Sequence, residues 1–470
     1  MASRVRGRED TSIFSLIFET VRRAFAEFLF IPTCLIAGFF LLAAGTYFLD
    51  TSQIGNAGPL RKFLQSHIFS NSDATSSLLA AIAAGIITMT SITISLLLIA
   101  VQQSAGSLTG QVYDQFLRRK TNQIYFGFFI GLALYSLITL ATVSERFNPV
   151  FGATIAFVAT TVSLYLLILL LYTTINQMRP IEIIEAIHEH ILAAGERQRR
   201  FLGRTRRETV FSGAMRFPVR TEKHGYVTRI YLDQIAKAAG SDGEVVMLVP
   251  IGAYVAFGDE IAIATANTSE AAAKLAAAAK AAFTIERQRD IALDPAFGIQ
   301  QVEMIAWTSI STSKSNPAPG LIAIQCLRDV MARWSEVEVE ERAAEETVPV
   351  VYSTDTFDKL FSTLETFAVV SSESMQHQIY IEVLRTFTLM FDRLSDERRD
   401  RAEDLILRIL SALGDHVLTY DLDNALAEMA TKLMNSGRTV AADAVRQARK
   451  QMLGSVGKLG SRSTRVQGGN

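Results

Sequence analysis

The sequence predicts an α-helical integral membrane protein with a soluble part that combines a small β-rich domain and α-helices. Four uncharged apolar stretches, each long enough to cross a bilayer, occupy the first 175 residues. Basic residues flank these stretches unequally, as they do around membrane spans. The composition agrees, because 49% hydrophobic residues and a mean hydropathy of +0.23 are high for a purely soluble chain.

The four spans are predicted at residues 28–49, 78–101, 124–143 and 150–175, within a transmembrane domain that covers 25–177. A helix needs roughly 20 apolar residues to cross a hydrocarbon core about 30 Å thick. Only "SERFNP" joins the third span to the fourth. These two spans are therefore predicted to form a helical hairpin.

The distribution of Lys and Arg predicts the orientation. Arg residues crowd the N-terminal segment 1–24, follow the second span at Arg118 and Arg119, and recur after the fourth. Cytoplasmic flanks collect such residues. We therefore expect both termini in the cytoplasm and residues 50–77 outside the cell.

The second span carries a stripe of small and polar side chains that includes Thr88, Ser91, Ser95 and Gln102. One interpretation is a water-lined surface, on which hydroxyl and amide groups replace part of the hydration of a solute. The other is helix packing, in which small residues allow close approach and hydroxyls bond to neighbouring helices or to their own backbone. The sequence leaves both open.

None of the four predicted spans contains a charged side chain. Ion-coupled and proton-coupled carriers usually hold an ionisable residue within the membrane, despite its energetic cost. This argues against a proton relay and leaves a passive path or no path.

An amphipathic connecting helix is predicted over 178–214, where isoleucines recur at helical spacing opposite glutamates. Its basic end contains Arg197, Arg199, Arg200 and Arg204. These arginines are candidate contacts to anionic lipid headgroups or another anion. A solvated face of positive-inside residues explains the same pattern.

A small β-rich domain is predicted over 215–267. The phrase "VPIGAYVAFGDEIAIA" is similar to the turn of barrel-sandwich hybrid domains, the small β-folds of lipoyl and biotinyl carriers, and it implies a barrel-like fold. Carriers need an exposed lysine at a hairpin tip, and none lies between Val245 and Ile263, so no covalent cofactor is expected. Gly252 and Gly258 are predicted to occupy turns with positive φ.

The rest of the chain reads as helical. A segment over 268–347 contains the loop "STSKSNPAPG", which is either an anion site or a turn built from favoured turn residues. Amphipathic patterns over 348–452 predict a helical bundle or short array. The Gly- and Ser-rich tail, 453–470, is predicted to be disordered.

Four spans at this spacing resemble an uncharacterised family of bacterial predicted integral membrane proteins, a domain of unknown function. Three stretches carry the resemblance: the one beginning "MTSITISLLLIAVQQSAGS", "HGYVTRIYLDQIAKAA", and "DPAFGIQQVEMIAWTSI" with the loop that follows. The resemblance covers roughly residues 25–435 and implies a topology but no activity. The loop departs from the family pattern at Ser311-Thr312 and Ser315-Asn316-Pro317, where the pattern has Ser-Pro and Asn-Asp-Pro, so a function of that acidic side chain does not carry over.

Several classes of function find no support in the sequence. The net charge of −1 gives no basic field for nucleic acid. The chain shows no Walker loop, nucleophile elbow, paired-His motif or Cys-pair zinc signature, so no enzyme, cofactor or metal site is predicted. His188 and His190 do not share a helix face, and the two cysteines, Cys34 and Cys326, do not form a disulfide framework.

Two functional hypotheses follow. In the first, a homo-oligomer in the bilayer forms a channel or pore around the stripe of the second span, above a cytoplasmic vestibule. In the second, the chain is a membrane-anchored scaffold or sensor whose C-terminal helices bind a protein partner. A carrier would need an intramembrane binding site that the uncharged spans do not indicate.

Overall fold

A computed structural model describes residues 29–51, 58–69, 71–105, 120–177, 179–211, 215–240, 242–340, 347–354 and 356–454. The predicted N-terminal segment 1–24 lies outside these residues, as do Arg118, Arg119 and nearly all of the predicted tail. The chain divides into two compact units between Arg179 and Pro180. We describe each unit by itself.

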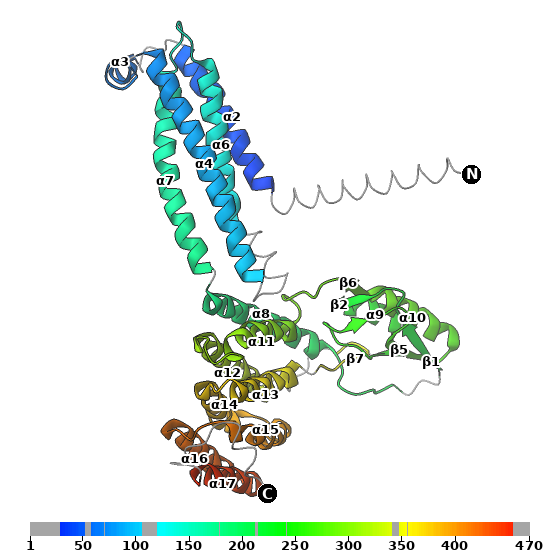
Figure 1. The fold of residues 1–470 in the computed structure, drawn as a ribbon. Coiled ribbons are helices and arrows are strands. Elements are labelled where there is room, and N and C mark those ends of the chain that lie inside the picture. Colours follow the sequence, from blue (N-terminus) through cyan, green and yellow to red (C-terminus); the bar gives the residue numbers. More distant parts are fainter. Residues whose placement is uncertain are drawn as a thin grey trace, which may run out of the picture. The chain divides into compact units, whose positions relative to one another are not determined.

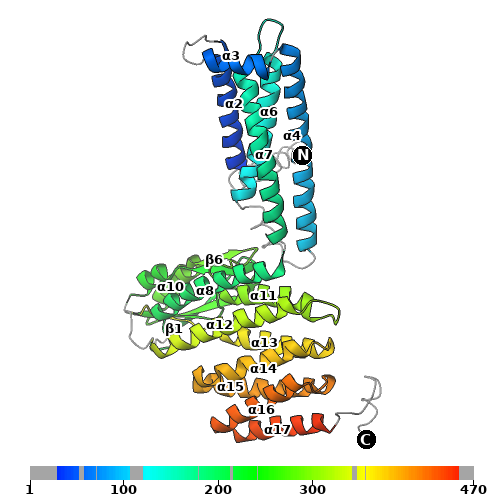
Figure 2. The same cartoon turned by 90° about the vertical axis from the view of Figure 1, so that its left-hand side faces the viewer.

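The first unit contains the four long apolar helices that the sequence predicts. They are α2 (Phe30–Thr51), α4 (Ser72–Ala105), α6 (Lys120–Thr142) and α7 (Val150–Gln177). All four are long and apolar enough to cross a membrane, which confirms the four candidate spans. They run alongside one another as a bundle (Figures 1 and 2). A short helix, α3 (Gly58–His67), lies across one end of the bundle, within the segment 50–77 between the first two predicted spans.

Helix α6 occupies the centre of the bundle and contacts α2, α4 and α7. Half of the residues in the most apolar 18-residue stretch of α6 are buried, compared with 17% of those in the corresponding stretch of α7. Two glycines bring α2 close: a Cβ atom on Gly127 would lie 2.8 Å from the Pro32 Cα, and one on Gly131 would lie 2.3 Å from the Phe39 ring. Small residues are the usual means of close helix approach in lipid, where burial of apolar surface gives little driving force.

The first span ends differently from its prediction. Helix α2 continues two residues beyond Leu49 and so includes Asp50, which is only 2% exposed. The predicted span 28–49 ends one residue before Asp50, so the prediction of uncharged spans did not cover this acid, which the helix includes. The Asp50 carboxylate accepts backbone N–H bonds from Phe151 and Gly152, each at 3.0 Å, in the first turn of α7. These donors have no partner within a helix, and the helix N-terminus favours a negative charge.

The second unit begins with α8 (Pro180–Arg204), and its later helices stack against α8 and one another. They are α11 (Pro295–Ile310), α12 (Ala318–Glu340), α13 (Thr356–Glu373), α14 (His377–Met390), α15 (Asp396–Ile409), α16 (Tyr420–Asn435) and α17 (Thr439–Leu453). Helix α11 contacts α13, α12 contacts α14, and α14 contacts α16. Alternate helices thus share a layer, and Figure 2 shows the stack. This arrangement is a short helical array rather than a closed bundle.

The β-rich part of the second unit has two small sheets. In the first sheet the strand order is β1 (Met215–Arg220), β5 (Glu260–Ala266), β3 (Gly243–Met247) and β7 (Val350–Val351). In the second sheet the strand order is β4 (Tyr254–Val255), β2 (Gly225–Ile230) and β6 (Phe283–Glu286). The sheets do not close into a barrel, so the expected barrel-like fold is not found. Both sheets recruit strands from beyond residue 267, which local sequence patterns do not reveal.

Two helices complete this β-rich part. Helix α10 (Ser269–Ala282) packs its alanines against β1, β3 and β5, and α9 (Leu232–Ala239) packs beside α10. The shared core includes Val245, Ala264 and Leu275. Gly252 and Gly258 have φ values of +92° and +88°, which confirms their predicted role in turns.

Candidate functional site

The exposed face of α4 is the candidate functional site in the membrane unit. The opposite face of α4 packs against α6 and α7. Its buried residues recur every three or four positions, as helix geometry requires: Leu79, Ile82, Ile86, Met89 and Thr93. Most of the intervening residues, although not Ala83, are left uncovered by the described residues of the chain.

Three of the residues predicted to line a pore lie on this uncovered face. Thr88, Ser91 and Ser95 are all exposed, as are Ala81 and Ala84, one to three turns earlier. Gln102 belongs to α4, but its side chain lies outside the part of the chain that the structure describes. The polar stripe is therefore not wedged between helices of its own bundle.

Two hydroxyl groups of the stripe, those of Thr88 and Ser95, bond to their own helix. Thr88 Oγ1 donates to the carbonyl oxygen of Ala84 at 2.9 Å, and Ser95 Oγ donates to that of Ser91 at 3.0 Å. Such bonds let a helix carry hydroxyls through lipid without unsatisfied donors. The lone pairs of the hydroxyl oxygens still face outward and can accept bonds from water or from another chain.

The stripe differs from the exposed face of α7 in the size of its side chains. Helix α7 presents bulky residues over most of its length, including Phe157, Tyr165 and Tyr172. The α4 stripe presents Ser, Ala and Thr, with Ile87 and Ile92 beside it. Small residues on an uncovered membrane helix are typical of contacts between helices.

The four arginines predicted as headgroup contacts all lie on α8. Arg197 donates to the Ala292 carbonyl oxygen at 2.7 Å, Arg199 pairs with Glu196 at 2.7 Å, and Arg204 pairs with Asp233. Arg200 is exposed. Three of the four thus have partners within the soluble unit, which leaves Arg200 as the one best placed for an external anion.

The loop after α11 forms a turn and a helix cap. The Asn316 side chain accepts the Ala318 N–H at 3.0 Å where α12 begins, and Thr312 and Ser315 bond to each other. Gln376 donates to the carbonyl oxygens of Ser309 and Thr312, both at 2.8 Å. Thr312, Ser315 and Asn316 thus form bonds within the fold, whereas Ser311, Ser313 and Lys314 are exposed.

A buried ion pair ties the end of α8 to the sheet. Glu244 on β3 is fully buried and accepts bonds from Arg206 at 2.9 Å, from Thr209 and from two backbone N–H groups. Burial opposes ionisation of this carboxyl, but the hydrogen bonds more than offset it and lower the pKa of Glu244. The pair serves the fold and touches no cavity described here.

The described residues offer neither a cluster of metal ligands nor, at Cys326, a reactive thiol. Within the described ranges, no three His, Cys, Asp or Glu side chains gather in a way that could hold a metal ion. His188 instead pairs with Asp329 at 3.0 Å. Burial raises the pKa of the Cys326 thiol to about 11, which keeps it protonated and unreactive near neutral pH.

The fold and the α4 face define a class: a membrane protein with four candidate transmembrane helices and a second unit of β-sheets and stacked helices. The chain belongs to the family of predicted membrane proteins designated DUF2254, whose model matches residues 26–388. Comparison with curated proteins found no match, and comparison with solved structures found none.

Proposed function

We propose that this protein is a homo-oligomeric channel or pore-like protein of the bacterial inner membrane, with both termini in the cytoplasm. Copies of α4 surround a shared axis and turn their small polar stripes toward it. The soluble units form a vestibule on the cytoplasmic side. Because α2, α4 and α7 pack around α6, the described helices of one subunit leave no path among them, so the path is between subunits.

The observation that supports this proposal most directly is the exposure of Thr88, Ser91 and Ser95 on α4. A purely lipid-facing surface favours bulky apolar residues such as those of α7. On α4 a stripe of small side chains with hydroxyls lies beside the exposed large residues Ile87, Ile92, Ile94, Leu98 and Ile99. In a wet interior the outward lone pairs of these hydroxyls replace part of the hydration of a passing solute. Because the hydroxyl hydrogens stay on the helix, the lining would present acceptors and favour cations over anions.

The test compares two exposed hydroxyl residues on different helices, one in the α4 stripe and one outside it. Thr161 on α7 is exposed and bonds back to the Phe157 carbonyl oxygen at 3.2 Å, but it stands among bulky apolar residues. We expect Ser91→Leu to reduce the potassium chloride conductance of purified protein in planar bilayers, and Thr161→Leu to leave it unchanged. Both variants should retain the oligomeric mass of the wild-type protein in detergent.

Cysteine chemistry separates a wet axis from a dry contact. In a chain with Cys34 and Cys326 replaced by Ser, Ser91→Cys should react with a charged, water-soluble thiosulfonate and form disulfides between copies. Thr161→Cys should do neither. Copies that cross-link at position 91 but exclude the reagent would show a packed interface, and a monomer without conductance would end the channel proposal.

The scaffold remains the second candidate because the soluble helices form an open array. Stacked helical pairs present extended surfaces that commonly bind other proteins. The scaffold hypothesis expects Ser91→Leu to disrupt assembly rather than flux. Conductance and oligomeric mass, measured on the same preparation, therefore distinguish the two functions.

A further inference from the structure

A cavity of about 510 Å³ lies in the membrane unit, away from the α4 stripe. Residues of α2, of α6 and of the first turn of α7 line it, together with Pro149, and we name it the Asp50 cavity. Its volume falls within the range of about 300–1,000 Å³ that is usual for small-molecule sites. Nothing in the proposed channel uses it.

The polar groups of the cavity are suited to a ligand that donates hydrogen bonds. Asp50 is the only charged side chain in its lining and accepts two N–H bonds, whereas a carboxylate has about four acceptor positions. Thr46, Thr139 and Thr142 each donate their hydroxyl hydrogen to a backbone carbonyl, at 2.7–3.1 Å. These groups therefore leave acceptors, and a negative charge, for a ligand.

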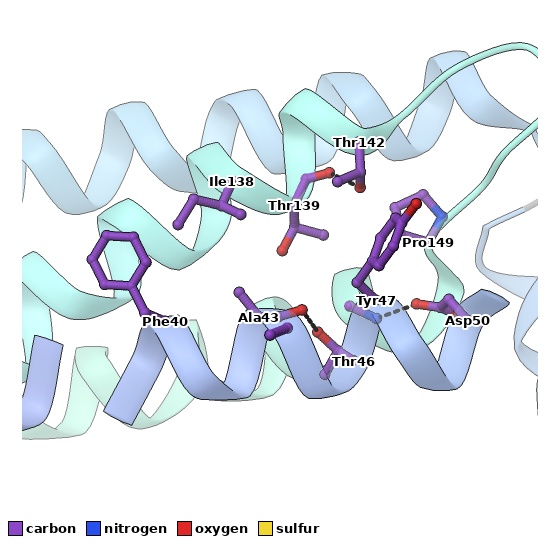
Figure 3. Close-up of a pocket in the computed structure, with 11 residues that line it drawn as sticks. Phe40, Ala43, Thr46, Tyr47, Asp50, Ile138, Thr139, Thr142 and Pro149 are labelled. Carbon is purple, nitrogen blue, oxygen red and sulfur yellow. Dashed lines mark hydrogen bonds between the residues drawn. The ribbon is translucent and has the colours of Figure 1, made fainter. Parts of the chain in front are cut away.

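The cavity is also polar at one end and apolar at the other. Figure 3 shows Asp50, Thr142 and Pro149 at one end, and Phe40 and Ile138 at the opposite end. Ten residues of α2 separate Phe40 from Asp50, about 15 Å along a helix. Asp50 stands near the end of its span, where a bilayer changes from headgroups to hydrocarbon, so the gradient matches a ligand with a polar head and an apolar chain.

Close packing fixes the size of the cavity. Gly152 lies in the lining, and a Cβ atom there would come within 2.7 Å of a Thr139 methyl carbon, so the α7 side cannot carry a larger residue without shifting. On the α2 side the lining includes Ala43 and Ala44. Ala44 is exposed, so a larger side chain at this position can enter the cavity without disturbing the packed core of the bundle.

We propose that the Asp50 cavity binds an amphiphile whose ammonium group contacts the Asp50 carboxylate and whose alkyl chain extends toward Phe40 and Ile138. The aromatic ring of Tyr47 in the lining adds attraction for a cation. An anionic head would meet the carboxylate and acceptor oxygens instead. The ammonium group belongs either to a free alkylamine or to an amine-bearing lipid of the bilayer.

The probe is dodecylamine, added to the full-length protein in a maltoside detergent and counted by native mass spectrometry. We expect Asp50→Asn to raise the dissociation constant about tenfold or more, since a hydrogen bond to a charged group is lost. Asn still offers one oxygen to cap α7. Asp73→Asn, an exposed acid in the first turn of α4, is the matched control and should bind like wild type.

Two further variants test the site without removing the Asp50 carboxylate. Arg61 on α3 is the positive charge that acts on Asp50, so Arg61→Gln should lower the dissociation constant for dodecylamine. Ala44→Phe should fill the cavity and abolish binding. A purely structural role of Asp50 predicts that neither variant changes the dissociation constant for dodecylamine. If Asp50→Asn fails to fold, these two variants still test the proposal.

Two comparisons complete the test. Dodecanoic acid, with the same chain and an anionic head, should not bind; equal binding of the acid and the amine would overturn the proposal, as would equal affinity in wild type, Asp50→Asn and Ala44→Phe. If phosphatidylethanolamine stays bound to the purified chain and dodecylamine displaces it, the ligand is a lipid. If dodecylamine binds to a chain that retains no lipid, the ligand is a free amine.

Discussion

The Nδ1 atoms of His377 and His416 lie 2.7 Å apart and share a hydrogen bond between the start of α14 and the segment before α16. One ring must therefore be neutral at this nitrogen to accept the bond. His416 is buried against the Tyr380 ring, and its Nε2 atom has no partner among the described residues. Burial lowers the pKa of His377, and burial together with the charge of His377 lowers the pKa of His416 to about 4.

This pair predicts that the helical array loses stability in acid. His416 titrates near 6.5 when unfolded and near 4 when folded, so the unfolded chain binds more protons between these values. The stability is complete above about pH 6.5 and falls as the pH drops toward 4, by on the order of 3 kcal/mol. Hydrogen exchange of α14 and α16, corrected for its intrinsic pH dependence, measures the effect. His416→Gln should flatten it, and an unchanged pH profile in that variant would contradict the assignment.

The close contact between α2 and α6 predicts that alanine destabilises the membrane unit at Gly127 but not at Gly38. Gly127→Ala forces a Cβ atom against the backbone of Pro32 and should destabilise the membrane unit by about 1–3 kcal/mol. Gly38→Ala on α2 meets no atom within 4 Å and should be neutral or slightly stabilising, because alanine favours a helix. Thermal unfolding in detergent compares the two. Equal melting temperatures would mean that the α2–α6 contact tolerates a methyl group.

The buried carboxylate of Glu244 predicts a large loss of stability when its charge is removed. Glu244→Ala leaves Arg206 and two backbone N–H groups without their acceptor and should cost about 3–5 kcal/mol. The matched control is Glu260→Gln, which breaks an exposed pair with Arg220 and should cost at most about 1 kcal/mol. Urea unfolding of the full chain, followed by tryptophan fluorescence, gives both values. Similar losses in the two variants would show that the Glu244 network contributes little.

The proposed orientation predicts which cysteines a membrane-impermeant maleimide reaches in intact cells. With Cys34 and Cys326 replaced by Ser, Lys62→Cys on exposed α3 should react from outside the cell. Tyr420→Cys, where the native side chain is 81% exposed, should react only after the membrane is permeabilised. Reaction at position 420 in intact cells would reverse the orientation.

Much of the fold could be predicted from local sequence patterns. The apolar runs identify the four long helices, because length and hydropathy are properties of each segment alone. The positive φ of Gly252 and Gly258 follows from their places in short turn sequences. The predicted barrel-like domain is not found, because a sheet depends on segments that are far apart in the chain. Strand pairing is set by partners distant in sequence, and β7 comes from residues 350–351, far beyond the predicted domain.

The candidate sites divide in the same way. The sequence identified the α4 stripe by its helical periodicity, but only the packing of α6 and α7 shows that Thr88 and Ser91 are left uncovered. The sequence does not show the partners of Arg197 and Arg204, because these lie 95 and 29 residues away in the chain. Asp50 was missed because it follows the last apolar residue of its span. An acid at a span boundary, near the start of another helix, is the signal that could have suggested it.

The sequence by itself determined that this chain has four apolar helices and a larger polar part of helices and short strands, because hydrophobic periodicity acts within each segment. The tertiary structure decided which faces are covered and which polar groups are buried. Asp50 gains its environment only when α7 places two N–H groups beside it, and the α4 stripe stays exposed because α6 takes the opposite face. Burial and charge compensation depend on neighbours, and the neighbours are set by the packing of the whole bundle.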